Sequence, residues 1–66
     1  MHTMDSRELL RRLQAAGWFE VRKKGSHVQL KHADRPGLVT LPHPKRELPK
    51  GTLRSIERQS GVKLLG

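Results

Sequence analysis

Apolar residues near the N-terminus recur at the spacing of a helix. Four of them fall on one side of such a helix: Leu9, Leu10, Leu13 and Ala16. Asp5 stands where it can cap the N-terminus, and Glu8 follows three residues later, as in a capping box. Gly17 can adopt the left-handed conformation that ends a helix. The pattern predicts a first helix between Asp5 and Gly17 that buries its apolar side.

Residues 19–24 and 27–31 alternate between apolar and polar side chains, as half-buried strands do. The side chains expected to point inward are Phe19, Val21, Val28 and Leu30. Those expected to point outward are Glu20, Arg22, Lys24, His27, Gln29 and Lys31. Gly25 and Ser26 predict a tight turn between the two stretches, which makes them a hairpin.

A third short strand is predicted at residues 38–41. Val39 and Leu41 are its inward pair, and Pro42 is expected to end it. The preceding residues 33–37, ADRPG, are typical of a loop.

The C-terminal part predicts a second helix, with Pro49 in its first turn and Gly61 at its end. The apolar residues expected to pack inward are Leu53 and Ile56, with Val62, Leu64 and Leu65 folding back as a tail. Trp18 is assigned to the core, because a small core needs its area; stacking on a base is the alternative. The predicted order is α-β-β-β-α, an α+β fold. Its three-stranded antiparallel sheet carries two helices on one face and leaves the other face open.

Composition narrows the class of protein. The chain has 66 residues, so residues 1–66 are taken as one domain with a small core. Its formal net charge of +8 suits a polyanion such as RNA or DNA, an anionic membrane or an acidic protein. Cysteine is absent. No apolar run approaches the roughly 18 residues of a membrane span, and no signal-peptide core is present. We therefore expect a soluble cytoplasmic protein that binds nucleic acid and does not enter the membrane.

His27 falls on the open face of the predicted sheet, whereas Val28 and Leu30 point inward. A metal site would need partner ligands, and the other histidines show no ligand spacing: His2, His32 and His43. Hence no metal and no other cofactor is expected. Two interpretations remain. His27 is a plain surface histidine, or it takes a proton from a ribose 2′-OH while neighbouring cations stabilise the phosphate.

Three stretches resemble the HicA family of mRNA interferase toxins, the toxin half of bacterial type II HicA–HicB toxin–antitoxin pairs. The stretches are residues 13–19 (LQAAGWF), 21–30 (VRKKGSHVQL) and 39–62 (VTLPHPKRELPKGTLRSIERQSGV). Together they cover nearly the whole chain. The combination of Gly-Ser-His with GTLRSI and with the Gly17-Trp18 pair, in this order and spacing, is specific to the family.

The resemblance implies a double-stranded-RNA-binding-domain-like fold and cleavage of mRNA without a metal. It implies that His27, in the Gly-Ser-His turn, is the catalytic residue. It also implies that a HicB antitoxin covers the active site, and that released toxin arrests growth. Separately from the resemblance, the free protein is expected to be a monomer.

Other site residues follow from their positions. Ser26 either orients the imidazole or a phosphate oxygen, or simply makes the turn. His43 is a candidate because it falls in one of the motifs that carry the resemblance, and it has either an active-site role or a structural role in its loop. The candidates for contact with the RNA backbone are Arg22, Lys23, Lys24, Gln29 and Lys31. Two functions without catalysis compete with the nuclease: a module that only binds RNA or DNA, and an interaction subunit for an acidic partner.

Overall fold

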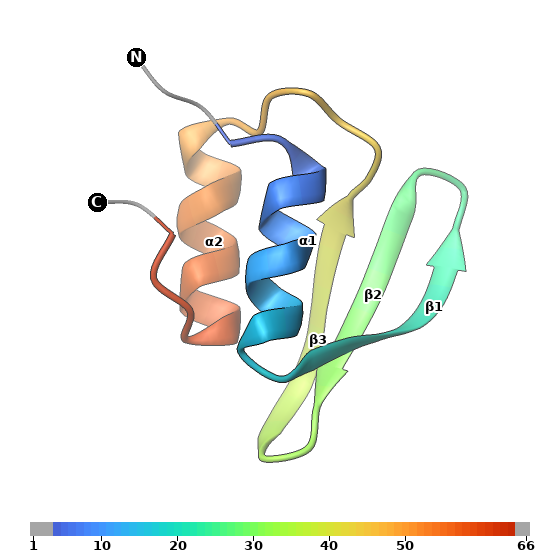
Figure 1. The fold of residues 1–66 in the computed structure, drawn as a ribbon, viewed down its shortest axis with the longest axis vertical. Coiled ribbons are helices and arrows are strands. Elements are labelled where there is room, and N and C mark those ends of the chain that lie inside the picture. Colours follow the sequence, from blue (N-terminus) through green and yellow to red (C-terminus); the bar gives the residue numbers. More distant parts are fainter. Residues whose placement is uncertain (1–3, 65–66) are drawn as a thin grey trace.

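Two helices and three strands follow one another as α1 (Ser6–Ala15), β1 (Trp18–Lys24), β2 (His27–His32), β3 (Arg35–Pro42) and α2 (Lys50–Ser60). The computed structural model describes residues 4–64. The strands form one antiparallel sheet in the order β1-β2-β3. Both helices pack on the same side of this sheet, and β1 is its edge far from α2 (Figure 1). The predicted α-β-β-β-α fold is therefore confirmed.

The core lies between the helices and the inner face of the sheet, which is the face that the helices cover. Its apolar residues are Met4, Leu9, Leu13, Trp18, Val28, Leu30, Val39, Leu41, Leu48, Leu53, Ile56 and Leu64. The prediction of a buried Trp18 is confirmed, since 2% of the residue is exposed. Leu48, which is 1% exposed, was not assigned to the core from the sequence. It lies in the connector between β3 and α2, where apolar residues do not recur at the spacing of a helix or a strand.

The first helix begins as its sequence predicts. The Asp5 carboxylate accepts a hydrogen bond of 2.8 Å from the backbone N–H of Glu8. Ala16 was expected in the buried stripe, and this is wrong, because it is the exposed C-cap residue rather than part of the helix. Gly17 then takes a φ of 100°, which turns the chain into β1 and favours glycine.

The inward orientation predicted for Phe19 and Val21 is also wrong. They are 49% and 46% exposed. Phe19 pairs with Lys31 on the open face, and the strand register shifts between Glu20 and Arg22, which is a β-bulge at Val21. Since β1 is also the edge far from α2, only its first residue, Trp18, is buried.

The third strand is longer than predicted. Only Ala33 and Asp34 form the turn, and β3 already begins at Arg35, so the predicted loop over 33–37 is wrong in extent. Within this turn, the His32 ring accepts a hydrogen bond of 2.9 Å from the Asp34 backbone N–H. Val39 and Leu41 are fully buried, as expected.

The second helix follows its predicted pattern. Leu53 and Ile56 are buried, and Gly61 ends the helix with a φ of 74°. Pro49 is the N-cap residue rather than part of the first turn. Of the tail, Leu64 is buried and Val62 packs partly against the core; Leu65 lies outside the described residues. Within residues 4–64, neither helix is long and apolar enough to cross a membrane.

Candidate functional site

His27 is the first residue of β2 and lies on the open face of the sheet. Its Cα partners are Lys24 on β1 and Pro42 on β3. The residue is exposed, and no hydrogen bond engages its ring within residues 4–64. The imidazole is therefore accessible to a bound molecule.

A hollow on the open face joins His27 to the basic residues of the hairpin. We call it the basic hollow; its lining residues are Arg22, Lys24, Gly25, Ser26, His27, Gln29 and Thr40. The strand register explains this grouping. Arg22 pairs with Gln29, and Gln29 pairs with Thr40, so the three side chains stand in one row across the sheet. Two guanidinium or ammonium groups beside an imidazole suit a phosphate and its ribose.

Most residues predicted for the site come together in this hollow, namely Arg22, Lys24, Ser26, Gln29 and His27. Lys23 and Lys31 do not line it. Lys23 pairs with Val28 and so belongs to the inner side of β1, while Lys31 pairs with Phe19 farther along the open face. Ser26 makes the predicted turn, and its backbone carbonyl accepts a hydrogen bond of 2.8 Å from the His43 N–H. Its hydroxyl makes no hydrogen bond to the His27 ring in the described part of the chain.

Thr40 was not singled out from the sequence, although a signal for it exists. It lies between the inward Val39 and Leu41, so alternation alone places it on the open face with His27. Its residue type carries no chemical signature, and only the strand register brings it next to Gln29.

A second hollow lies on the other side of His27, between β3 and α2. We call it the β3–α2 groove; it is lined by His27, Thr40, Pro42, Gly51, Thr52, Ser55, Ile56 and Gln59. Apart from His27, no residue that lines this groove is titratable. His27 and Thr40 belong to both hollows and therefore mark the place where they meet.

His43 lines neither of these two hollows. Its ring nitrogen Nδ1 lies 2.7 Å from the hydroxyl of Ser6, which also accepts a hydrogen bond of 2.8 Å from the Lys45 N–H. Ser6 is 2% exposed, so this contact ties the loop after β3 to the first turn of α1.

Of the remaining two histidines, His32 contacts the core. His32 packs against Trp18, with ring centroids 5.3 Å apart, and its Nε2 lies 2.9 Å from the Ala16 carbonyl oxygen. His32 is also the Cα partner of the buried Trp18, so its ring lies on the inner side of the sheet, away from the face of His27. His2 lies outside the described residues. Among residues 4–64, no three His, Asp or Glu side chains gather into a metal-binding group.

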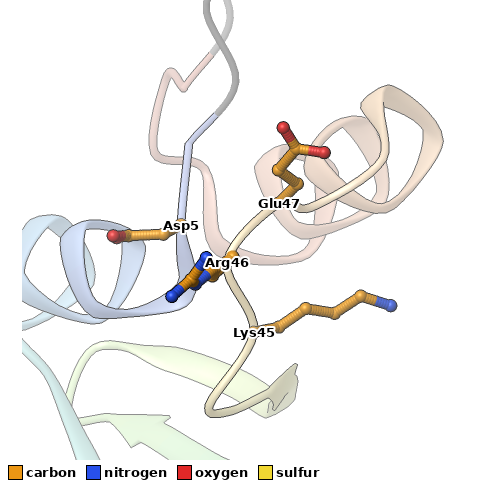
Figure 2. A pocket seen from close by; sticks show the side chains of 4 residues that line it. All are labelled: Asp5, Lys45, Arg46 and Glu47. Atoms are coloured by element: carbon orange, nitrogen blue, oxygen red, sulfur yellow. The ribbon is translucent and has the colours of Figure 1, made fainter.

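Another hollow lies where the loop after β3 meets the start of α1. Asp5, Lys45, Arg46 and Glu47 line it (Figure 2). Lys45 and Glu47 point away from Asp5, and the hollow combines two cations with two carboxylates. It contains no candidate from the sequence, and its mixed charge gives no preference for an anion.

Both the sequence and the fold match known proteins. A family model described as "HicA toxin of bacterial toxin-antitoxin" matches residues 6–62. A chain in the structure "HicA3 and HicB3 toxin-antitoxin complex" is 39% identical with a TM-score of 0.82, and the match covers 94% of this chain and 100% of that chain. A chain in a toxin–antitoxin complex from Streptococcus pneumoniae is 35% identical with a TM-score of 0.75, covering 89% of this chain and 98% of that chain. A search of curated proteins finds no match. The resemblance expected from the sequence is thus confirmed, and the chain belongs to the HicA toxin family of bacterial toxin–antitoxin systems.

Proposed function

We propose that this protein is a toxin that cleaves mRNA, with His27 as its catalytic residue, and that a HicB antitoxin neutralises it. One observation carries the catalytic part of the proposal. His27 is an exposed imidazole without an internal hydrogen bond, at the edge of a hollow that also holds Arg22 and Lys24. Membership of the HicA family supports the role as a toxin.

The reaction that suits this site is attack by a ribose 2′-OH on the adjacent phosphorus. His27 takes the proton of the 2′-OH as the 2′ oxygen forms its bond to phosphorus. The bond between phosphorus and the 5′ oxygen breaks, and the 5′ oxygen takes a proton from water. The hydroxide left behind then takes the proton that His27 holds, which returns the imidazole to its starting form. The products are a 2′,3′-cyclic phosphate and a 5′-hydroxyl end. A single imidazole is enough to begin this reaction.

Arg22 and Lys24 would bind the phosphate and stabilise the negative charge that builds on its oxygens. Lys24 is the direct Cα partner of His27, so the two side chains project from adjacent positions on neighbouring strands. The same cations make the hollow unsuited to a divalent metal ion, which prefers carboxylate ligands. The proposed reaction therefore proceeds without a metal.

The test is cleavage of a long single-stranded mRNA in EDTA, comparing wild type with His27→Ala. We expect wild type to cut the RNA and the variant to leave it intact. The expected loss is at least about 100-fold, since a positioned acid or base contributes roughly that much. Because His27 is exposed and makes no hydrogen bond through its ring, His27→Ala should unfold at the same temperature as wild type.

Binding to the same RNA is the control for this experiment. His27→Ala should still shift the RNA on a native gel, because the cations of the basic hollow remain. If wild type shifts the RNA but does not cut it, the chain is a binding module and the nuclease proposal is wrong. If His27→Ala cuts as fast as wild type, another residue carries the reaction.

The antitoxin part of the proposal has its own test. The two similar solved structures are both toxin–antitoxin complexes, which supports a protein partner for this chain. We expect a molar excess of the cognate HicB to stop cleavage and to protect the β1–β2 hairpin from hydrogen exchange. Inhibition with protection confined to α1 and α2 would place the antitoxin elsewhere on the toxin.

A further inference from the structure

The β3–α2 groove differs in chemistry from the basic hollow, although both border His27. The groove residues contributed by α2 are Gly51, Thr52, Ser55, Ile56 and Gln59. Their spacing of three and four residues places them on one side of the helix. Ile56 is 2% exposed and forms an apolar part of the wall, while Thr52, Ser55 and Gln59 present uncharged polar groups.

These polar groups are not used by the fold. Within residues 4–64, no side-chain hydrogen bond engages Thr52, Ser55 or Gln59. All three lie at least partly exposed, so their hydroxyl and amide groups are available to a bound molecule. Hydroxyls and an amide donate and accept hydrogen bonds, which matches the edge of a base or a ribose hydroxyl rather than a phosphate.

The groove also begins close to the proposed reaction centre. Pro42, which lines the groove, is the Cα partner of His27, and such partners lie about 4.5–5.5 Å apart. A nucleotide in the groove would therefore adjoin a phosphate held between His27 and the cations of the basic hollow.

We propose that the β3–α2 groove binds the base and ribose of the nucleotide next to the phosphate that is cut, and that Ser55 and Gln59 determine which nucleotide is preferred. This inference rests on the proposed function, because it takes RNA as the ligand. Under this proposal the two hollows bind different parts of the RNA. The basic hollow holds the phosphate without regard to sequence, and the groove reads the nucleotide and distinguishes RNA from DNA through the 2′-OH.

Binding is measured in the His27→Ala background, so that no RNA is cut. The probes are short single strands of A, C or U and their DNA counterparts. The test variant also carries Ser55→Ala and Gln59→Ala. Alanine favours the helix at both positions, so a loss of fold is not expected. The control carries Gln14→Ala, which matches the Gln59→Ala change at an exposed position of α1 outside both hollows.

We expect the test variant to bind its preferred RNA about fivefold more weakly per hydrogen bond lost. It should approach equal affinity for the three bases and for DNA, and the control should keep the original preferences. Unchanged preferences in the folded test variant would overturn the inference.

The same variants are also made in the protein that keeps His27, and the positions at which they cut a long mRNA are mapped. A changed pattern of cut sites supports the groove as the place where the nucleotide is read, and an unchanged pattern contradicts it. Failure of the proposed function is a separate result, because wild type would then leave the mRNA intact while the binding measurements still test the groove.

Discussion

At the scale of single residues, the two histidines of the family motifs have different surroundings. His27 has no hydrogen-bond partner for its ring in the described chain, whereas the His43 ring lies 2.7 Å from the buried hydroxyl of Ser6. The sequence left an active-site role and a structural role open for His43. Its hydrogen bond to Ser6, and its position outside both hollows that border His27, favour the structural role.

We predict that His43→Ala lowers the free energy of unfolding by about 1–2 kcal/mol, because the Ser6 hydroxyl loses one of its two partners. Cleavage by the folded variant should stay within about threefold of wild type, since the ring lies outside both hollows that border His27. Urea unfolding and a cleavage assay well below the midpoint measure the two effects.

Ser6→Ala is the matched variant, since it removes the same hydrogen bond from the other side. The two substitutions together should cost clearly less than the sum of their separate effects. A loss of about 100-fold in cleavage by His43→Ala, with unchanged unfolding, would instead place His43 in the reaction.

At the scale of elements, the β1–β2 hairpin gathers cations where no helix covers the sheet. Arg22 and Lys24 stand on the open face because the bulge at Val21 resets the alternation of β1. The helix α1 is also basic, but it packs on the inner face, and Arg12 already forms a salt bridge of 2.9 Å with Glu8. The net charge of +8 is thus shared between two sides of the molecule.

If RNA lies on the open face, Arg22→Ala should weaken binding of single-stranded RNA and reduce the slope of log K against log salt by about 0.7. Arg11→Ala makes the same change of charge at an exposed position of α1 and should leave the slope nearly unchanged. Both are measured in the His27→Ala background over a range of salt concentrations. Equal effects of the two substitutions would show that binding follows overall charge rather than this face.

At the scale of the whole molecule, one aromatic residue holds the sheet edge to the helices. Trp18 is 2% exposed and is the only buried residue of β1, while the adjacent Phe19 is 49% exposed on the other face. A core of this size supplies no more than a few kcal/mol of net stability, so the loss of one large side chain is comparable to the total.

We predict that Trp18→Ala removes about 3–5 kcal/mol and leaves the free toxin largely unfolded at room temperature. Phe19→Ala should cost less than about 1 kcal/mol, because its ring is half exposed. Circular dichroism during thermal unfolding checks both. A larger destabilisation by Phe19→Ala than by Trp18→Ala would contradict the orientation of β1 described above.

The sequence alone determined the order of the elements, the cap at Asp5, the end of α2 at Gly61 and the place of His27 on the open face. These features depend on local chemistry or on a period of two or 3.6, which can be counted along the chain. The motifs that carry the family resemblance are likewise short stretches of sequence that can be identified without a structure.

Only the tertiary structure decided which faces are covered. A period of two predicts which side chains share a face only while the strand is regular. Phe19 and Val21 were assigned inward, but the bulge at Val21 puts Phe19 on the open face, and both residues are half exposed. The bulge in β1, the burial of Leu48 and the contact between Ser6 and His43 depend on segments distant in sequence. The β3–α2 groove does so as well, because the helix that forms one wall lies eight residues beyond the end of the strand that forms the other. Such contacts arise when elements pack, and no local pattern encodes them.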